Sequence, residues 1–158
     1  MFREVSRGKQ QLRKEECIEI LKNTKRGILS VIGEEDYPYG MPLNHYYNEG
    51  DHCLYFHSGK QGYRIECLRK NDKVSFCVMD EGYQNEGEWA LNFQSVICFG
   101  RFEVVEDYEE SMEIVRKLSA KFTDDTKLIE DDIQRTGRKT LVFRIRIEHM
   151  TGKKVNES

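Results

Sequence analysis

The strongest chemical signal in the sequence is a group of polar and cationic residues where a predicted strand gives way to a helix. The strand ends at His57, a loop with two glycines that includes Ser58 follows, and the helix is expected to begin near Gln61 or Gly62. The N–H groups and the positive dipole end of a helix start attract phosphate, and Lys60 and Arg64 add cationic donors. The glycine spacing of P-loop and Rossmann sites is missing, so the pattern does not name the ligand. The alternative is a turn with solvated cations.

A second segment, Tyr37–His45, offers groups suited to a flat heteroaromatic ring. Pro38 and Pro42 interrupt a predicted strand. Prolines in such a run are typical of an edge strand or a bulge, where backbone N–H and C=O groups are free to meet something other than a neighbouring strand. Asn44 can both donate and accept hydrogen bonds at the edge of a ring. The alternative is an aromatic edge strand that closes a core.

The four histidines differ in what they offer to catalysis. His57 is the best candidate for a polar group acting near the site, and His45 is the second, because each lies within one of the two segments above. His52 begins a strand after a turn, and His149 follows the last predicted strand. No two cysteines have the short spacing of zinc ligands, so no metal is expected.

Length and composition limit the class of protein. The chain has 158 residues, which suits a single domain, 1–158, with one core. A formal charge of −3 provides no basic field for nucleic acid or an anionic membrane. No apolar run approaches the roughly 20 residues that span a bilayer, and the N-terminus has no secretory pattern. The five cysteines lie in apolar-periodic segments, as reduced cysteines do, so we expect a cytoplasmic protein.

Hydrophobic periodicity places these residues on strands and helices without a regular strand–helix–strand repeat. The pattern predicts an antiparallel α+β barrel rather than a doubly wound sheet. A bulge is expected at Gly100. Residues 1–11 are expected to form a loose N-terminal arm, and residues 150–158 a C-terminal tail. The expected helices are 12–24, 62–70, 108–122 and about 125–135, and the expected strands are 28–32, 37–47, 52–57, 73–79, 89–105 and 140–148.

Four segments, in the same order along the chain, resemble the pyridoxamine 5′-phosphate oxidase-like superfamily, and more closely its 5-nitroimidazole-resistance (Nim) branch. The likeness extends over about residues 10–150. It implies an FMN-binding split β-barrel, an antiparallel six-stranded Greek-key-like barrel with flanking helices, which forms a homodimer with FMN at the subunit interface. The segments are Tyr37–Asn44, Leu54–Ser58 with Gly62 and Arg64, Asn71–Val78, and Ser95–Arg101.

The resemblance also implies roles for individual residues. One group would line the flavin ring, a second would surround the ribityl phosphate, and a third would approach the flavin from the same subunit or its partner. In that order, the groups are Met41, Pro42, Leu43 and Asn44; His57, Ser58, Lys60 and Arg64, with Tyr63 nearby; and Ser95 and Val96. The first two groups coincide with the segments identified above from their chemistry.

The activity implied by the resemblance is that of an FMN-dependent oxidoreductase that reduces a small acceptor, such as the nitro group of a nitroimidazole. NAD(P)H or a separate reductase would supply the electrons, since the sequence has no separate nicotinamide signature. Pyridoxamine-phosphate oxidases carry a C-terminal segment rich in Arg and His, which Thr151–Ser158 does not match, so that oxidation is not expected. The alternatives are a flavin- or haem-binding carrier or sensor without turnover, and a dimer whose pocket is vestigial.

Overall fold

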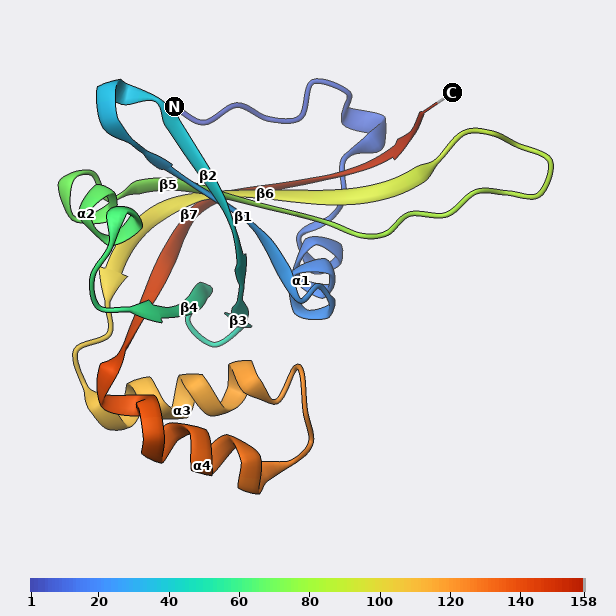
Figure 1. The fold of residues 1–158 in the computed structure, drawn as a ribbon. Coiled ribbons are helices and arrows are strands. Elements are labelled where there is room, and N and C mark those ends of the chain that lie inside the picture. Colours follow the sequence, from blue (N-terminus) through green and yellow to red (C-terminus); the bar gives the residue numbers. More distant parts are fainter. Residues whose placement is uncertain (158) are drawn as a thin grey trace.

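Seven antiparallel strands form one curled sheet in the computed structural model, which describes residues 1–157 (Figure 1). Their order is β2-β1-β5-β6-β7-β4-β3, so β2 and β3 are the two edges. With its flanking helices, this half-barrel confirms the α+β split-barrel class expected from the sequence. The strands are β1 (Arg26–Ile32), β2 (Pro38–Asn44), β3 (Tyr46–Asn48), β4 (Cys53–Gly59), β5 (Lys73–Met79), β6 (Asn92–Val104) and β7 (Thr140–Asn156). The helices are α1 (Lys14–Asn23), α2 (Tyr63–Lys70), α3 (Tyr108–Ser119) and α4 (Thr126–Thr136).

The predicted strand 37–47 is two strands in the structure, and this break opens the barrel. The chain leaves β2 at Asn44, turns at the buried His45 and enters β3 at Tyr46. β2 pairs with β1, and β4 pairs with β3 and β7, so no ladder within residues 1–157 joins β2 to β4. The sheet is therefore split along a seam between β2 and β4, where β2 has unpaired backbone groups.

Strand alternation fills the barrel interior with large apolar side chains. Leu141, Phe143 and Ile145 of β7 belong to the main core, as their alternation predicts, while Val142 faces the opposite side. The ring of Phe143 stacks on Phe56 with the centroids 5.2 Å apart. Helix α1 covers this core with its own buried residues.

β6 and β7 form a long two-stranded ribbon that extends beyond the barrel (Figure 1). The register shift between Phe99 and Gly100 confirms the predicted bulge. Only glycine fits there, because a Cβ added to Gly100 would lie 2.3 Å from the Arg146 carbonyl oxygen. The expected tail from residue 150 is wrong as far as Asn156, because β6 offers ladder hydrogen bonds along this whole stretch of β7. The last residue of that expected tail lies outside the described part.

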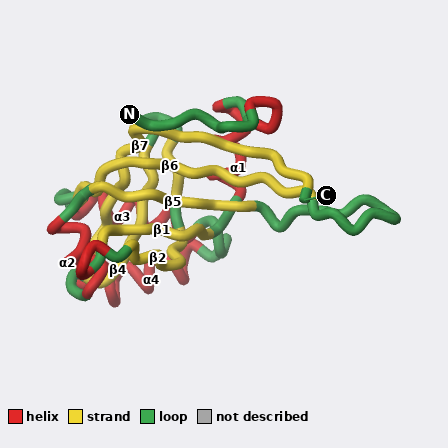
Figure 2. The backbone as a smooth tube through the Cα atoms, turned by 90° about the horizontal axis from the view of Figure 1, so that it is seen from above, coloured by secondary structure: helices red, strands yellow, loops and turns green. Residues whose placement is uncertain are grey.

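The N-terminal arm, expected to be loose, is docked along the ribbon (Figure 2). The ring of Phe2 stacks on Phe99 and His149, with centroid distances of 5.4 and 5.0 Å. The Leu12 N–H donates to the Gly152 carbonyl oxygen at 2.9 Å. These contacts give the arm a defined path.

Helices α3 and α4 form a hairpin beside β3 and β4 (Figure 1). Both helices begin with an aspartate cap: a carboxylate oxygen of Asp107 accepts from the Glu110 N–H, and one of Asp125 accepts from the Leu128 N–H. No helix within residues 1–157 is long and apolar enough to cross a bilayer. The apolar cluster that joins the hairpin to the outer side of the sheet is Cys53, Tyr55, Val105, Ile114 and Val142.

His45, the second candidate for catalysis, is fully buried at the corner between β2 and β3. Its position indicates a structural role. Its Nε2 lies 2.8 Å from the Leu21 carbonyl oxygen, and its ring packs edge-on against Phe76 with the centroids 5.0 Å apart. Lys121, just beyond α3, donates to the carbonyl oxygens of Thr24 and His45. The corner therefore ties α1, β1, the β2–β3 break and the hairpin together.

The buried His45 makes stability depend on pH. Burial, and then the nearby Lys121 ammonium, lower the pKa of His45 to about 4. In the unfolded chain the pKa of a histidine is about 6.5, so between these values the unfolded state binds more protons. Stability should therefore fall as the pH drops from about 6.5 to about 4, by about 3 kcal/mol from this residue.

Urea unfolding at several pH values measures this effect. The His45→Gln variant keeps a donor for the Leu21 carbonyl oxygen and should lose this part of the pH dependence. The same pH dependence in the variant and the parent protein would assign the effect to other groups.

Candidate functional site

The seam between β2 and β4 holds a cavity of about 230 Å³. It is lined by Pro42, Leu43 and Asn44 at the end of β2, by His57 of β4, and by Arg26 at the start of β1. Four residues predicted to hold a ligand are therefore brought together from two strands that do not pair.

The position of β2 at the sheet edge determines which of its groups face this cavity. Met41 is buried in the main core, while Pro42 is exposed and Leu43 and Asn44 are half-buried. The side chain of Met41 is thus committed to packing, and Met41 can reach a ligand at the seam only through its backbone. The prolines fit an edge strand, where one side of the backbone has no ladder to maintain.

Arg26 is a site residue that no sequence motif indicated. Its Nε donates to Asn44 Oδ1 at 3.2 Å, which leaves the Asn44 NH₂ group as a donor toward a ligand. Arg26 also borders an open cavity of about 840 Å³ beside α1 and the end of β5. A cation at the start of a strand is too common to signal a site, so only the fold reveals its role.

His57 lies between the seam cavity and a second cavity of about 640 Å³. It has the same strand parity as Cys53 and Tyr55, which pack on the hairpin side of β4, so it faces the hairpin too. Desolvation by the surrounding protein lowers the pKa of His57 below its ordinary value, while the Asp132 carboxylate opposes this shift. A lowered pKa favours the neutral imidazole, which offers one donor and one acceptor nitrogen.

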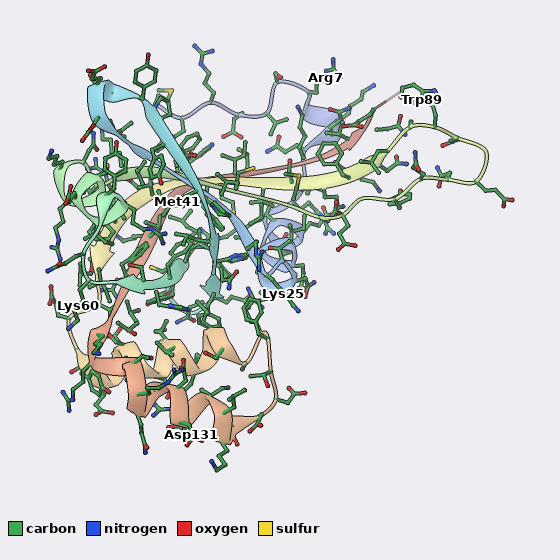
Figure 3. The ribbon with its side chains drawn as sticks, in the orientation of Figure 1. Arg7, Lys25, Met41, Lys60, Trp89 and Asp131 are labelled. Carbon is green, nitrogen blue, oxygen red and sulfur yellow. The ribbon has the colours of Figure 1, made fainter. Side chains whose placement is uncertain are left out.

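The hairpin supplies the far wall of this second cavity, a role that no sequence motif indicated. The sequence predicted α3 and α4 as helices and marked neither as part of a site, yet both line this cavity. Figure 3 marks Asp131 on α4, at the charged side of this wall. The wall consists of apolar Leu118, Phe122, Leu128 and Ile129, polar Ser119 and Thr123, and charged Asp131, Asp132 and Arg135.

The turn from β4 into α2 has the features that the sequence predicted for an anion site. Gly62 has φ of +127°, which favours glycine, and a Cβ added there would meet open space. Among the described residues, no side chain caps the first N–H groups of α2, so these donors stay available. Ser58 Oγ donates to the Gly59 carbonyl oxygen at 2.7 Å, and Arg64 is half-buried in the first turn of α2.

Tyr63 joins α2 to the β1–β2 hairpin, whereas Lys60 borders a different cavity. The Glu34 N–H donates to the Tyr63 hydroxyl at 2.8 Å, and the Tyr63 and Tyr39 rings meet edge-on at 5.0 Å. Lys60, marked in Figure 3, lines a cavity of about 290 Å³ together with Arg138. The residues predicted to surround a phosphate are therefore divided among the seam, the start of α2 and this cavity.

Ser95 and Val96 lie on β6 and do not line the seam cavity as the structure describes it. Val96 is fully buried in the main core, and Ser95 pairs with Met79 and Lys153 within the sheet. The Val96 side chain is therefore committed to the core, and Ser95 lies away from the seam of its own subunit.

Known proteins share both the sequence pattern and the fold. A family model described as pyridoxamine 5′-phosphate oxidase matches residues 13–154. No curated protein sequence matches the chain. The matched region includes β2, β4, α2 and the α3–α4 hairpin, which are the elements that form the cavities.

Solved structures with this fold come from several bacteria. A candidate 5-nitroimidazole antibiotic resistance protein from Bacteroides thetaiotaomicron has 24% identity and a TM-score of 0.78, with 92% of this chain and 87% of that chain covered. A FAD-binding protein from Mesorhizobium loti has 24% identity and a TM-score of 0.64, with 92% and 97% covered. A FAD- and heme-binding protein from Mycobacterium smegmatis has 15% identity and a TM-score of 0.72, with 91% and 72% covered.

The environment of His57 predicts a titration that can be measured directly. We expect the pKa of His57 to lie below the ordinary histidine value, and the Asp132→Asn variant to lower it further, because the opposing carboxylate is removed. NMR titration of the imidazole ring measures both values. Asp124→Asn, an exposed carboxylate of the α3–α4 loop that does not line the cavity, is the matched control. A His57 pKa that rises in Asp132→Asn would contradict this electrostatic arrangement.

Proposed function

Because this chain belongs to the pyridoxamine 5′-phosphate oxidase family, we propose that it binds FMN at the seam between β2 and β4 and reduces a small acceptor molecule. The observation that carries this proposal is the seam cavity, where groups suited to a flavin ring meet from two unpaired strands. The FAD-binding proteins of the same fold from M. loti and M. smegmatis support a flavin as the class of ligand.

The residues at the seam fit the parts of FMN. Pro42 and Leu43 offer apolar surface to the faces of the ring, and Asn44 and His57 offer hydrogen bonds to its edge. The uncapped start of α2, with Arg64 in its first turn, offers N–H and guanidinium donors to the phosphate. When bound, the flavin supplies the redox chemistry.

The protein's own groups would orient the reactants and place a proton. The lowered pKa of His57 favours its neutral form, and the residue lies between the ring site and the second cavity, so it can hydrogen-bond an acceptor or hold a proton for it. Arg26 holds the Asn44 amide in one orientation. The B. thetaiotaomicron structure supports a nitroaromatic acceptor, and NAD(P)H or a separate reductase would supply the electrons.

We propose that the chain works as a homodimer with FMN at the subunit interface. The sides of β1, β5 and β6 that face away from the core carry apolar side chains in register, since Ile28 pairs with Cys77 and Cys77 with Ile97. Ile28 and Ile97 are 41% and 39% exposed, and Figure 2 shows these strands side by side. A second copy on this face would remove the patch from water and could bring Ser95 to the partner's seam.

Phosphate anchoring can be tested with a matched pair of arginine variants. Arg64→Ala should weaken FMN binding by about 1.5–3 kcal/mol, the scale of a hydrogen bond to a charged group. Arg69→Ala removes an exposed arginine from the last turn of the same helix and should leave the affinity unchanged. Titration of FMN fluorescence measures both. Equal affinities for the two variants would rule out Arg64 as a phosphate ligand.

The absorbance spectrum of the freshly purified protein tests the cofactor, and anaerobic reoxidation of the reduced holoprotein tests turnover. We expect retained flavin bands and reoxidation by a nitroaromatic compound that is faster than that of free reduced FMN. His57→Ala should slow this reoxidation more than it weakens FMN binding. Protein that retains no added FMN would reject the proposal, and retained FMN without faster reoxidation would indicate a flavin carrier or sensor.

A further inference from the structure

The cavity that Lys60 lines lies apart from the seam. It has a volume of about 290 Å³ and lies where the β4–α2 turn approaches the start of α3 and the start of β7. Lys60 comes from the turn, and Arg138 comes from the segment just before β7 (Figure 3). Arg64 does not line this cavity. The cavity is therefore distinct from the place proposed above for the flavin phosphate.

The two cations of this cavity have no carboxylate partner. Within residues 1–157, neither Lys60 nor Arg138 makes an ion pair. By contrast, Arg116, Arg135 and Arg144 of the neighbouring elements each pair with a carboxylate. An anion in the cavity would therefore meet donors that no carboxylate of the described chain occupies.

Arg138 is held in position by a tyrosine. Its guanidinium carbon lies 4.8 Å from the centroid of the Tyr108 ring. The tyrosine fits because residue 137 is glycine, since a Cβ added to Gly137 would lie 2.9 Å from the Tyr108 hydroxyl oxygen. A guanidinium that lies over a ring keeps the N–H groups of its edge available. Holding the side chain in advance lowers the entropy lost when a ligand binds.

The rest of the lining combines apolar surface with one carboxylate. Val105, Leu141 and Val142 line the cavity and are only 5%, 8% and 1% exposed, so they form a fixed apolar wall. Glu106 adds a single negative charge against the two cations, so positive charge prevails. The cavity is therefore suited to a ligand with an anionic head and a compact apolar body.

We propose that this cavity binds a phosphate monoester with a compact apolar body, with the phosphate oxygens at Lys60 and Arg138 and near the Tyr108 hydroxyl. A phosphate monoester presents three terminal oxygens, so it can accept from donors of several elements at once, whereas a carboxylate presents two oxygens in one plane. The site goes beyond the proposed flavin function and does not depend on it.

Phenyl phosphate and benzenesulfonamide are matched probes. Both carry a tetrahedral head on a benzene ring, and only the phosphate is charged at neutral pH. Calorimetric titration of the protein in a buffer without phosphate, with FMN in excess to occupy the flavin site, gives both affinities. We expect phenyl phosphate to bind at least about tenfold more tightly, a difference of about 1.4 kcal/mol. Equal affinities would overturn the proposal.

Variants of the charged residues locate the binding to this cavity. Arg138→Gln and Lys60→Gln should each weaken phenyl phosphate binding by about tenfold, the scale of a hydrogen bond to a charged group. Glu106→Gln removes the opposing charge and should tighten binding by about threefold. Lys139→Gln, at an exposed position next to Arg138 and outside the cavity, is the control and should change nothing. Circular dichroism checks that each variant is folded.

Two outcomes of these titrations would overturn the proposal. Equal losses in Arg138→Gln and Lys139→Gln would indicate attraction to surface charge in general. Phenyl phosphate binding that appears without FMN and is lost when FMN is added would assign the cavity to the flavin phosphate. Protein that retains no FMN but still binds phenyl phosphate through Arg138 would contradict the flavin function and support this cavity.

Discussion

The open seam between β2 and β4 is the constraint on which the rest of the structure depends. A closed barrel would satisfy the outer backbone groups of both strands with a ladder and leave no space between them. Here the chain leaves β2, turns at His45 and enters β3. β3 pairs with β4, so within residues 1–157 β2 does not pair with β4. Asn44 and His57 line one cavity because their strands approach without pairing.

The buried corner at His45 holds the strands beside the seam in place. His45 is held by the Leu21 carbonyl oxygen, and Lys121 reaches the carbonyl oxygens of Thr24 and His45 from the end of α3. Burial lowers the pKa of Lys121 to about 8, so the ammonium remains mostly charged at neutral pH and both hydrogen bonds are charge-assisted. One side chain thus ties the end of α3 to the corner.

How much the sequence could reveal depends on whether a feature is local. The bulge at Gly100 and the inward alternation of β7 were predictable, because both follow from neighbouring residues. The segment Pro42–Asn44 and His57 were predicted from their chemistry, and the seam joins them. By contrast, the extension of β7 to Asn156 depends on pairing with β6 rather than on apolar alternation. The sequence of this polar segment therefore gave no indication of a strand. Arg26 and the hairpin wall depend on tertiary contact and carry no motif.

The two sides of the candidate site are built from elements with different tolerance to change. Pro42, Asn44 and His57 lie on strands whose positions follow from ladders and from the main core, so a change there alters register or packing. Phe122 and Leu128 are exposed side chains at the end of the hairpin, which is held at its base by the cluster around Tyr55 and Ile114. Substitutions at exposed positions have small effects on stability. The hairpin wall can therefore vary while the seam keeps its geometry, which is how one fold can host several functions.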